Sequence, residues 1–314
     1  MKPIVLALVG PTGSGKTSTA IQLCKKLNAE IVSMDSMQIY RGMDIGTAKP
    51  TKDELSQAPH HMIDVADPDE LFTVSMYREM AFKVIDDIIA RGKIPMLVGG
   101  TGLYLQAISY EMSLGENGAD NDLRKELNRI AEEPDGPMKL HNRLRLVDPQ
   151  SAEKLHPNDI RRVIRALEIY ETSGKAKSER TDEQRKEGPY RVLVYGLSLP
   201  REEMYAKINR RVDEMMNLGL VDEVKALLLQ GIKPSKDGGS MQAIGYKEIV
   251  SALNGEISLD QAVHLIKQGS RRYAKRQWTW FRHDHRTKWY DWSDFSTPEL
   301  LIDTLYNQIM SDMD

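Results

Sequence analysis

Residues 10–17 read GPTGSGKT and match the phosphate-loop pattern G-x-x-x-x-G-K-[ST] at every fixed position. An apolar run, Ile4–Val9, precedes this segment, and a helix-forming run at residues 18–27 follows it. A strand before the loop and a helix after it distinguish a true phosphate loop from a chance match. The sequence therefore predicts a strand that turns into a helix around the phosphates of a bound ligand.

The residue types in this loop suit the binding of di- or triphosphate oxygens. Its glycines let successive backbone N–H groups turn inward, Lys16 adds a mobile positive charge, and the Thr17 hydroxyl can bind a magnesium ion. We predict that the whole loop contacts the phosphates: Gly10, Pro11, Thr12, Gly13, Ser14, Gly15, Lys16 and Thr17. Mg2+ is the expected cofactor, with Thr17 as its protein ligand. The loop alone does not identify which bond is broken.

Strand-like and helical runs alternate along the first third of the chain. Strands are predicted at residues 4–9, 30–34 and 94–98, and helices at 18–27 and around Val74–Ala90. This alternation is typical of βαβ units, which form a parallel sheet covered by helices on both faces. Residues 190–199 are strand-like again and are expected to return to the sheet. Amphipathic helices are predicted at roughly 201–230, 240–253 and 258–282.

A change of composition separates the middle of the chain. Residues 115–188 are charged and helix-compatible, are punctuated by prolines and contain no strand-like run. A chain of 314 residues has room for one large core and a smaller lobe. We therefore predict a phosphate-loop core formed by residues 1–114 and 189–314, with an inserted all-helical domain at residues 115–188.

The net charge of −3 conceals basic clusters at residues 161–165 and 271–276, so it does not argue against nucleic-acid binding. Cys24 is the only cysteine, which excludes an intramolecular disulfide and a cysteine-rich zinc site. We expect its side chain to be buried as a small apolar group. Because no apolar run approaches the length of a membrane span, we expect a cytoplasmic protein with no membrane partner.

Asp35 stands at the carboxyl end of the second predicted strand. In a doubly wound sheet it would emerge at the same edge as the phosphate loop. Three roles are open: an indirect contact to magnesium through its bound water, a general base acting on an acceptor held beside the phosphates, or an aspartate that only caps a helix or shapes a turn.

Residues 99–102 read GGTG after another buried strand, and Thr101 offers the only hydroxyl in that turn. The glycines would let the backbone approach a ligand, although a strand-to-helix turn without a ligand explains them equally well. His60 and His61 are candidates for metal binding. Adjacent histidines point to different faces of an extended segment, and no cysteine is nearby, so a structural loop is the better interpretation.

Two segments place basic side chains on one helix face. Arg161 and Arg165 are four residues apart after a cap at Asn158 or Asp159, which suits contact with a phosphate backbone. A solvated face paired with Glu168 is the alternative.

The second face carries Arg272, Lys275, Arg276 and Thr279. Aromatic residues are interleaved with it, namely Tyr273, Trp278, Trp280 and Phe281. These rings could stack unpaired bases, or they could form the core side of the helix.

The ordered motifs of the chain resemble those of bacterial tRNA dimethylallyltransferases, also called tRNA isopentenyltransferases. The motifs are GPTGSGKT, DSMQIYRGMDIGTAKP, PHHMIDV, VGGTGLY, LHPNDIRRVIRALE, QAIGYKE and RRYAKRQWTWFR, and they run from residue 10 to residue 282. The second and fifth are the most specific. Met34 departs from the small residue expected before the aspartate, but Asp35 itself is in place.

The resemblance implies a fold like that of P-loop NTPases and the transfer of a dimethylallyl group from dimethylallyl diphosphate to N6 of the adenosine 3′ of the anticodon, position 37 of tRNA. Diphosphate would leave from the phosphate loop, with Arg211 as a further contact to it. Asp35 would act as the catalytic base towards N6, and Thr101 would lie near the same adenine.

The resemblance also implies which residues bind the anticodon stem-loop of tRNA. They are Asp35, Ser36, Met37, Gln38 and Thr101 at the extruded base, and Arg124, Arg161, Arg162 and Arg165 on the helical domain. A monomer is expected.

Two other functions are weighed against this one. An ATP-dependent kinase of a nucleoside or small molecule would share the loop and the sheet, but no compact arginine-rich lid is evident between residues 115 and 188. A non-catalytic RNA-binding switch would need ATP or GTP for tRNA binding and would yield no covalent product.

Overall fold

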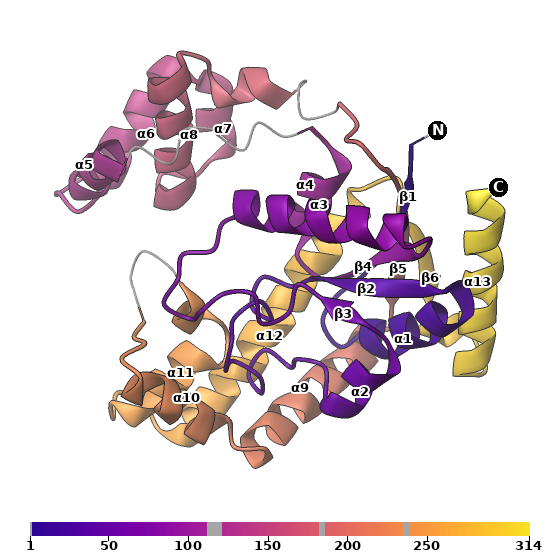
Figure 1. Ribbon diagram of the computed structural model, residues 1–314. Coiled ribbons are helices and arrows are strands. Elements are labelled where there is room, and N and C mark those ends of the chain that lie inside the picture. Colours follow the sequence, from indigo (N-terminus) through magenta and orange to yellow (C-terminus); the bar gives the residue numbers. More distant parts are fainter. Residues whose placement is uncertain (1, 112–120, 182–185, 235–238) are drawn as a thin grey trace. The chain divides into compact units, whose positions relative to one another are not determined.

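A computed structural model describes residues 2–111, 121–181, 186–234 and 239–314 of the chain (Figure 1). The chain divides into two compact units, one formed by residues 1–109 and 189–314 and the other by residues 110–188. The boundary predicted between residues 114 and 115 lies outside the described residues.

The larger unit is built on one sheet whose neighbouring strands are all parallel, in the order β3-β2-β4-β1-β5-β6. The strands are β1 (Ile4–Val9), β2 (Ala29–Met34), β3 (His60–His61), β4 (Ile94–Gly99), β5 (Arg191–Ser198) and β6 (Lys288–Asp291). The predicted parallel α/β sheet is confirmed. The short strands β3 and β6 were not predicted, and the histidine pair forms the edge strand β3, where a loop was expected.

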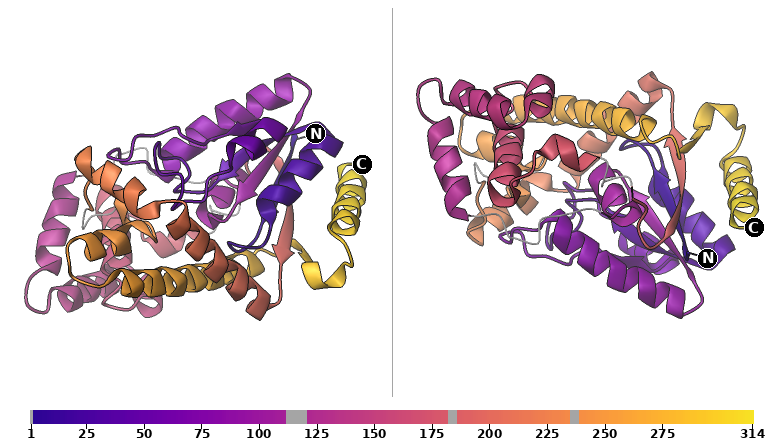
Figure 2. Two further views of the ribbon diagram at one scale, coloured as in Figure 1. Left: turned by 90° about the horizontal axis from the view of Figure 1, so that it is seen from below. Right: turned by 90° about the horizontal axis from the view of Figure 1, so that it is seen from above.

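Helices cover both faces of this sheet, as its apolar central strands β1 and β4 require. One face packs against α1 (Lys16–Leu27) and α13 (Pro298–Met313), and Cys24 is buried in that layer as expected. The other face packs against α3 (Val74–Ala90) and α4 (Gly102–Ser109). Figures 1 and 2 show the two layers.

The strand register aligns three loops at one edge of the sheet. Val9 of β1 is paired with Gly99 of β4, and Met34 of β2 is paired with the same glycine. The chain therefore leaves all three strands at one level, and the segments that begin at Gly10, Asp35 and Gly100 start side by side.

The remaining elements of this unit are mostly helices: α2 (Lys52–Gln57), α9 (Arg201–Asn217), α10 (Leu220–Leu229), α11 (Tyr246–Leu253) and α12 (Leu259–Arg282), with 3-10 turns at Ser240–Gln242 and Trp292–Asp294. The single helix predicted over residues 201–230 is in fact two. The break falls at Gly219, whose φ of +99° belongs to the left-handed region. Likewise, the helix predicted over 240–253 begins only at Tyr246.

The smaller unit is helical in all of its described elements: α5 (Asn121–Ala131), α6 (Gly136–Val147), α7 (Pro149–Lys154), α8 (Ile160–Ser173) and a 3-10 segment at Lys177–Thr181. Apolar side chains of α5, α6 and α8, including Leu127, Leu144 and Leu167, form its own core. In the described parts of the chain, no helix combines the length and the apolar character that a bilayer span requires.

Candidate active site

The phosphate loop lies between β1 and α1, as predicted. Lys16 folds back over the loop, and its Nζ donates hydrogen bonds to the carbonyl oxygens of Gly10 at 2.9 Å and Pro11 at 2.8 Å. Thr17 is the second residue of α1 and is half-buried. The amino end of α1 adds the positive end of its helix dipole to the charge of Lys16. The arrangement suits a di- or triphosphate.

Charged groups from three segments of the chain meet at this loop. Arg211 of α9 donates from Nη1 to the Thr12 hydroxyl at 3.2 Å. Burial and, to a smaller extent, the Arg211 charge lower the pKa of Lys16 to about 7, although the Asp35 carboxylate opposes both effects. Burial also lowers the pKa of Arg211, again against Asp35. The site thus holds two poorly solvated cations beside one carboxylate, which favours an incoming anion.

Asp35 forms a turn directly after β2. Its Oδ1 accepts hydrogen bonds from the backbone N–H groups of Met37 at 2.9 Å and Gln38 at 3.4 Å. The Thr101 hydroxyl oxygen accepts from the Ser36 N–H at 3.1 Å, and the Thr101 N–H donates to the Met34 carbonyl at 3.0 Å. The structure therefore brings the Asp35 turn and Thr101 together, beside the phosphate loop.

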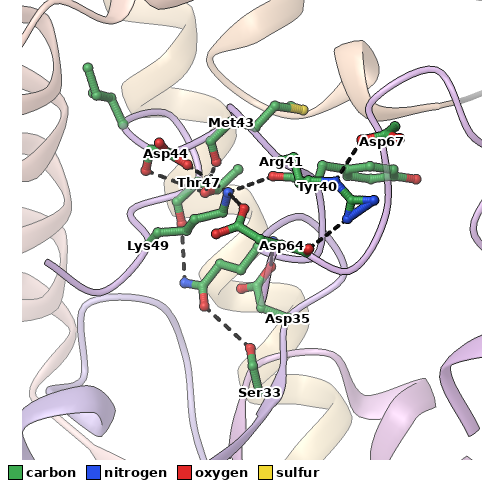
Figure 3. Close-up of polar contacts among 12 residues, drawn as sticks. Ser33, Asp35, Tyr40, Arg41, Met43, Asp44, Thr47, Lys49, Asp64 and Asp67 are labelled. Atoms are coloured by element: carbon green, nitrogen blue, oxygen red, sulfur yellow. Dashed lines mark hydrogen bonds and ion pairs between the residues drawn. The ribbon is translucent and has the colours of Figure 1, made fainter. Parts of the chain in front are cut away.

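Lys49 holds together the loop of residues 35–49, which follows this turn (Figure 3). Its side chain is only 6% exposed, and Nζ donates to the Tyr40 carbonyl and to the Asp44 carboxylate, both at 2.6 Å, and to the Asp64 carboxylate. Gln38 closes the loop from inside, since its amide donates to the Ala48 carbonyl at 3.1 Å. One buried ammonium thus fixes the path of the loop.

Glu223 of α10 holds the same loop from outside. Its carboxylate accepts hydrogen bonds from the N–H groups of Asp44 at 2.9 Å, Ile45 at 2.8 Å and Gly46 at 3.1 Å, and from the Tyr246 hydroxyl at 2.6 Å. Gly46 is required here, because a Cβ would lie 2.4 Å from the Tyr246 ring. The Glu223 carboxylate thus accepts hydrogen bonds from three N–H groups that have no acceptor within the turn.

Trp292, which directly follows the edge strand β6, also supports the phosphate loop. Its indole N–H donates to the Ser14 carbonyl at 2.8 Å, and Lys207 lies over its ring at 5.9 Å. Sequence analysis assigned no role to Trp292 or Glu223, and no local signal marks either residue. Lys49 and Tyr246 lie within the motifs DSMQIYRGMDIGTAKP and QAIGYKE, but the motifs alone did not indicate what either side chain contacts.

The predicted tRNA-binding arginines lie in the smaller unit. Arg161, Arg162 and Arg165 are exposed on α8, after a cap at Asp159. The Arg165 guanidinium lies 3.3 Å from the buried Glu168 carboxylate, which also accepts a 2.8 Å bond from Arg124 Nη2. Arg165 is therefore paired with Glu168, as the alternative to phosphate contact predicted. Arg124 is bonded to the same carboxylate.

The basic face of α12 is exposed at all four predicted positions. Phe281 is fully buried on the opposite side, and the Trp278 ring lies 4.5 Å from the Trp289 ring. Trp280 is 43% exposed. Two of the aromatic residues thus belong to the packing of the helix, as the core alternative predicted.

The histidine pair makes structural contacts. His61 Nε2 lies 2.8 Å from the buried Glu30 carboxylate, and His60 Nδ1 lies 2.8 Å from the Ala58 carbonyl. Within the described residues, no group of three or more His, Cys, Asp or Glu side chains is placed to hold a metal ion.

The parallel sheet and the loop at its carboxyl edge define a phosphate-loop α/β protein. The chain belongs to the IPP transferase family, whose model matches residues 38–284. A tRNA dimethylallyltransferase of Halalkalibacterium halodurans is 47% identical over 94% of this chain and 93% of its own length, and one of Bacillus subtilis is 48% identical over 92% and 91%. These matches confirm the family that the motif order predicted.

Solved structures agree with this assignment. The crystal structure of a tRNA isopentenylpyrophosphate transferase from Bacillus halodurans is 44% identical with a TM-score of 0.74, covering 99% of this chain and 96% of that one. A eukaryotic dimethylallyltransferase described as acting on tRNA is 31% identical with a TM-score of 0.84, covering 99% of this chain and 80% of that one.

Proposed function

We propose that this chain transfers a dimethylallyl group from dimethylallyl diphosphate to N6 of the adenosine 3′ of the anticodon, position 37 of tRNA, and releases diphosphate. The observation that carries the proposal is the shared level of the three loops after β1, β2 and β4, which puts the Asp35 turn and Thr101 beside the phosphate loop. A diphosphate in that loop would present its carbon–oxygen bond towards an acceptor at Asp35. The names of the relatives support the same reaction.

The reaction exchanges one bond for another. The N6 lone pair forms the new carbon–nitrogen bond, the carbon–oxygen bond breaks, and its electron pair leaves with the diphosphate. Lys16 and Arg211 lie where that negative charge would grow, and their poor solvation strengthens the interaction. Asp35 would accept the N6 proton, an effect of about 10²–10⁴-fold for a well-placed base.

The residues of the loop fit a magnesium-bound diphosphate. Thr17 presents a hydroxyl at the amino end of α1, and diphosphate oxygens and water would complete the coordination of the ion. When bound, magnesium would supply further neutralisation of the leaving group.

Recognition of tRNA would use two surfaces. Residues 35–38 and Thr101 would contact the base extruded from the anticodon loop. Arg161 and Arg162, together with Arg124 and Arg165 next to Glu168, would contact the backbone of the anticodon stem-loop.

The test is to incubate the protein with magnesium, unmodified tRNA and dimethylallyl diphosphate, to run a parallel sample with ATP, and to weigh the nucleosides after digestion. A five-carbon increment on adenosine with dimethylallyl diphosphate alone is expected. Consumption of ATP without modified adenosine would overturn the proposal in favour of a kinase.

A further inference from the structure

One side chain joins the two halves of the proposed site. Gln277 of α12 is 5% exposed; its Oε1 accepts the Thr12 N–H of the phosphate loop at 2.8 Å, and its Nε2 donates to the Gly100 carbonyl at 3.1 Å. The orientation of the amide is unambiguous, because an N–H group can only donate and a carbonyl oxygen can only accept.

The loop after β4 is shaped to receive this amide. A Cβ on Gly100 would lie 1.8 Å from Gln277 Nε2, and one on Gly102 would lie 2.0 Å from the Trp280 indole nitrogen. The close partner of these glycines is therefore α12, whereas sequence analysis considered only a ligand or a free turn. A larger residue at Gly100 would push the helix and the loop apart.

The connection continues from Gln277 to the Asp35 turn. The Tyr273 side chain, one turn earlier on α12, lies close to the side chains of both Gln277 and Thr101. Thr101 in turn accepts the Ser36 N–H. Gln277 therefore links the phosphate loop to Gly100, and the next residue, Thr101, is bonded to the residue next to Asp35.

We propose that Gln277 is a positioning residue that sets the distance and orientation between the phosphate loop and the Thr101–Asp35 side of the site. This inference rests on the proposed function. Transfer in line between a leaving oxygen and an attacking nitrogen is sensitive to misplacement, and an error of about 1 Å can cost about 10²-fold in rate. Gln277 would therefore act on turnover more than on tRNA binding.

The first experiment compares Gln277→Met with Gln268→Met, which makes the same change earlier on α12 at a partly exposed position. For Q277M we expect kcat to fall about 10²-fold with an unchanged Kd for tRNA, and for Q268M we expect the wild-type kcat. Equal kcat for the two variants would overturn the proposal, as would a loss of Q277M activity explained entirely by weaker tRNA binding.

Gln277→Glu separates positioning from simple packing. The new carboxylate still accepts the Thr12 N–H, but when ionised it has no proton to give to the Gly100 carbonyl. The ratio of kcat of Q277E to kcat of the wild-type protein should therefore rise as the pH falls, because the carboxyl group introduced in the variant gains a proton that it can donate. A ratio that does not change with pH would contradict the proposed role, even if Q277M proved unstable.

A measurement of diphosphate binding tests the role of Gln277 without relying on the proposed reaction. Inorganic diphosphate with magnesium should slow amide hydrogen exchange at residues 99–102 in the wild-type protein, and should not do so in Q277M. Absence of this transmitted protection in wild type would overturn the proposal about Gln277. Failure to form allylated adenosine would instead overturn the proposed function, and the exchange result would still decide the role of Gln277.

Discussion

The two loops that leave β1 and β2 at the same edge of the sheet hold their shape by different means. In the phosphate loop, Lys16 bonds to two carbonyl groups of the same turn, and Gln277 and Trp292 add contacts from α12 and from the segment after β6. The loop of residues 35–49 depends on distant carboxylates, those of Asp64 and Glu223. The shape of the phosphate loop can be predicted from eight consecutive residues. The shape of the loop of residues 35–49 can be understood only from contacts with distant parts of the fold.

The largest effect should come from Asp35, which tests whether the second loop carries chemistry. Asp35→Asn retains a side-chain oxygen to accept the Met37 N–H but removes the charge. We expect kcat to fall about 10²–10⁴-fold with tRNA affinity within a few-fold, and Asp35→Ala to behave alike. Single-turnover kinetics and tRNA binding would measure this. Weak binding with normal chemistry in the bound fraction would refute the assignment of Asp35 as the base.

Glu223→Ala tests whether the loop of residues 35–49 is held from outside. Three N–H groups and the Tyr246 hydroxyl lose their acceptor, so we expect a loss of about 2 kcal/mol in the free energy of unfolding and faster amide exchange at residues 44–46. Diphosphate affinity should not change. Asp222→Ala, which removes the exposed neighbouring carboxylate, is the control. Equal losses in the free energy of unfolding for the two variants would show that Glu223 does not hold the loop of residues 35–49.

The pH dependence of diphosphate affinity tests the phosphate loop. In the free protein the pKa of Lys16 is about 7, and a bound diphosphate would raise it. Below about pH 7 Lys16 is already charged; above it, binding must take up a proton, so affinity should fall by up to about tenfold per pH unit. Lys16→Arg stays charged and should lose this component. Calorimetric affinities that vary with pH identically in both proteins would contradict the prediction.

The smallest effect concerns the helical unit, where the proposed tRNA-binding surface is spread over several side chains. Arg161→Ala combined with Arg165→Ala should weaken tRNA binding and reduce its salt dependence, with a slope lower by about one for each lost phosphate contact. Titrations at several salt concentrations would show this. An unchanged slope would mean that these arginines do not meet the RNA.

The sequence predicts the elements whose signals are local. The phosphate loop, the first two long strands and the helix Val74–Ala90 follow from short patterns of apolar residues and glycines. The proximity of Asp35 and Thr101 also follows, because both come after strands of one parallel sheet. These features need only neighbouring residues and the rules of sheet topology.

The supports of the site could not be predicted in this way. Gln277 lies 265 residues from Thr12, and Glu223 lies 178 residues from Ile45, so no pattern within a helix or strand links them. The two-residue strand β3 gives no periodicity to detect. Gly46 and Gly100 do mark these contacts in the sequence, because the absence of a side chain leaves room for Tyr246 at the first position and for Gln277 at the second.

The indole of Trp292 reaches back to the Ser14 carbonyl, a contact that spans 278 positions of the chain. During synthesis the phosphate loop leaves the ribosome long before residue 292, whose side chain completes its support. Strand β5, which flanks β1 in the sheet, also comes late, at Arg191–Ser198. The phosphate loop must therefore wait for segments that are synthesised much later, and an interrupted chain would contain the phosphate-loop sequence without a finished site.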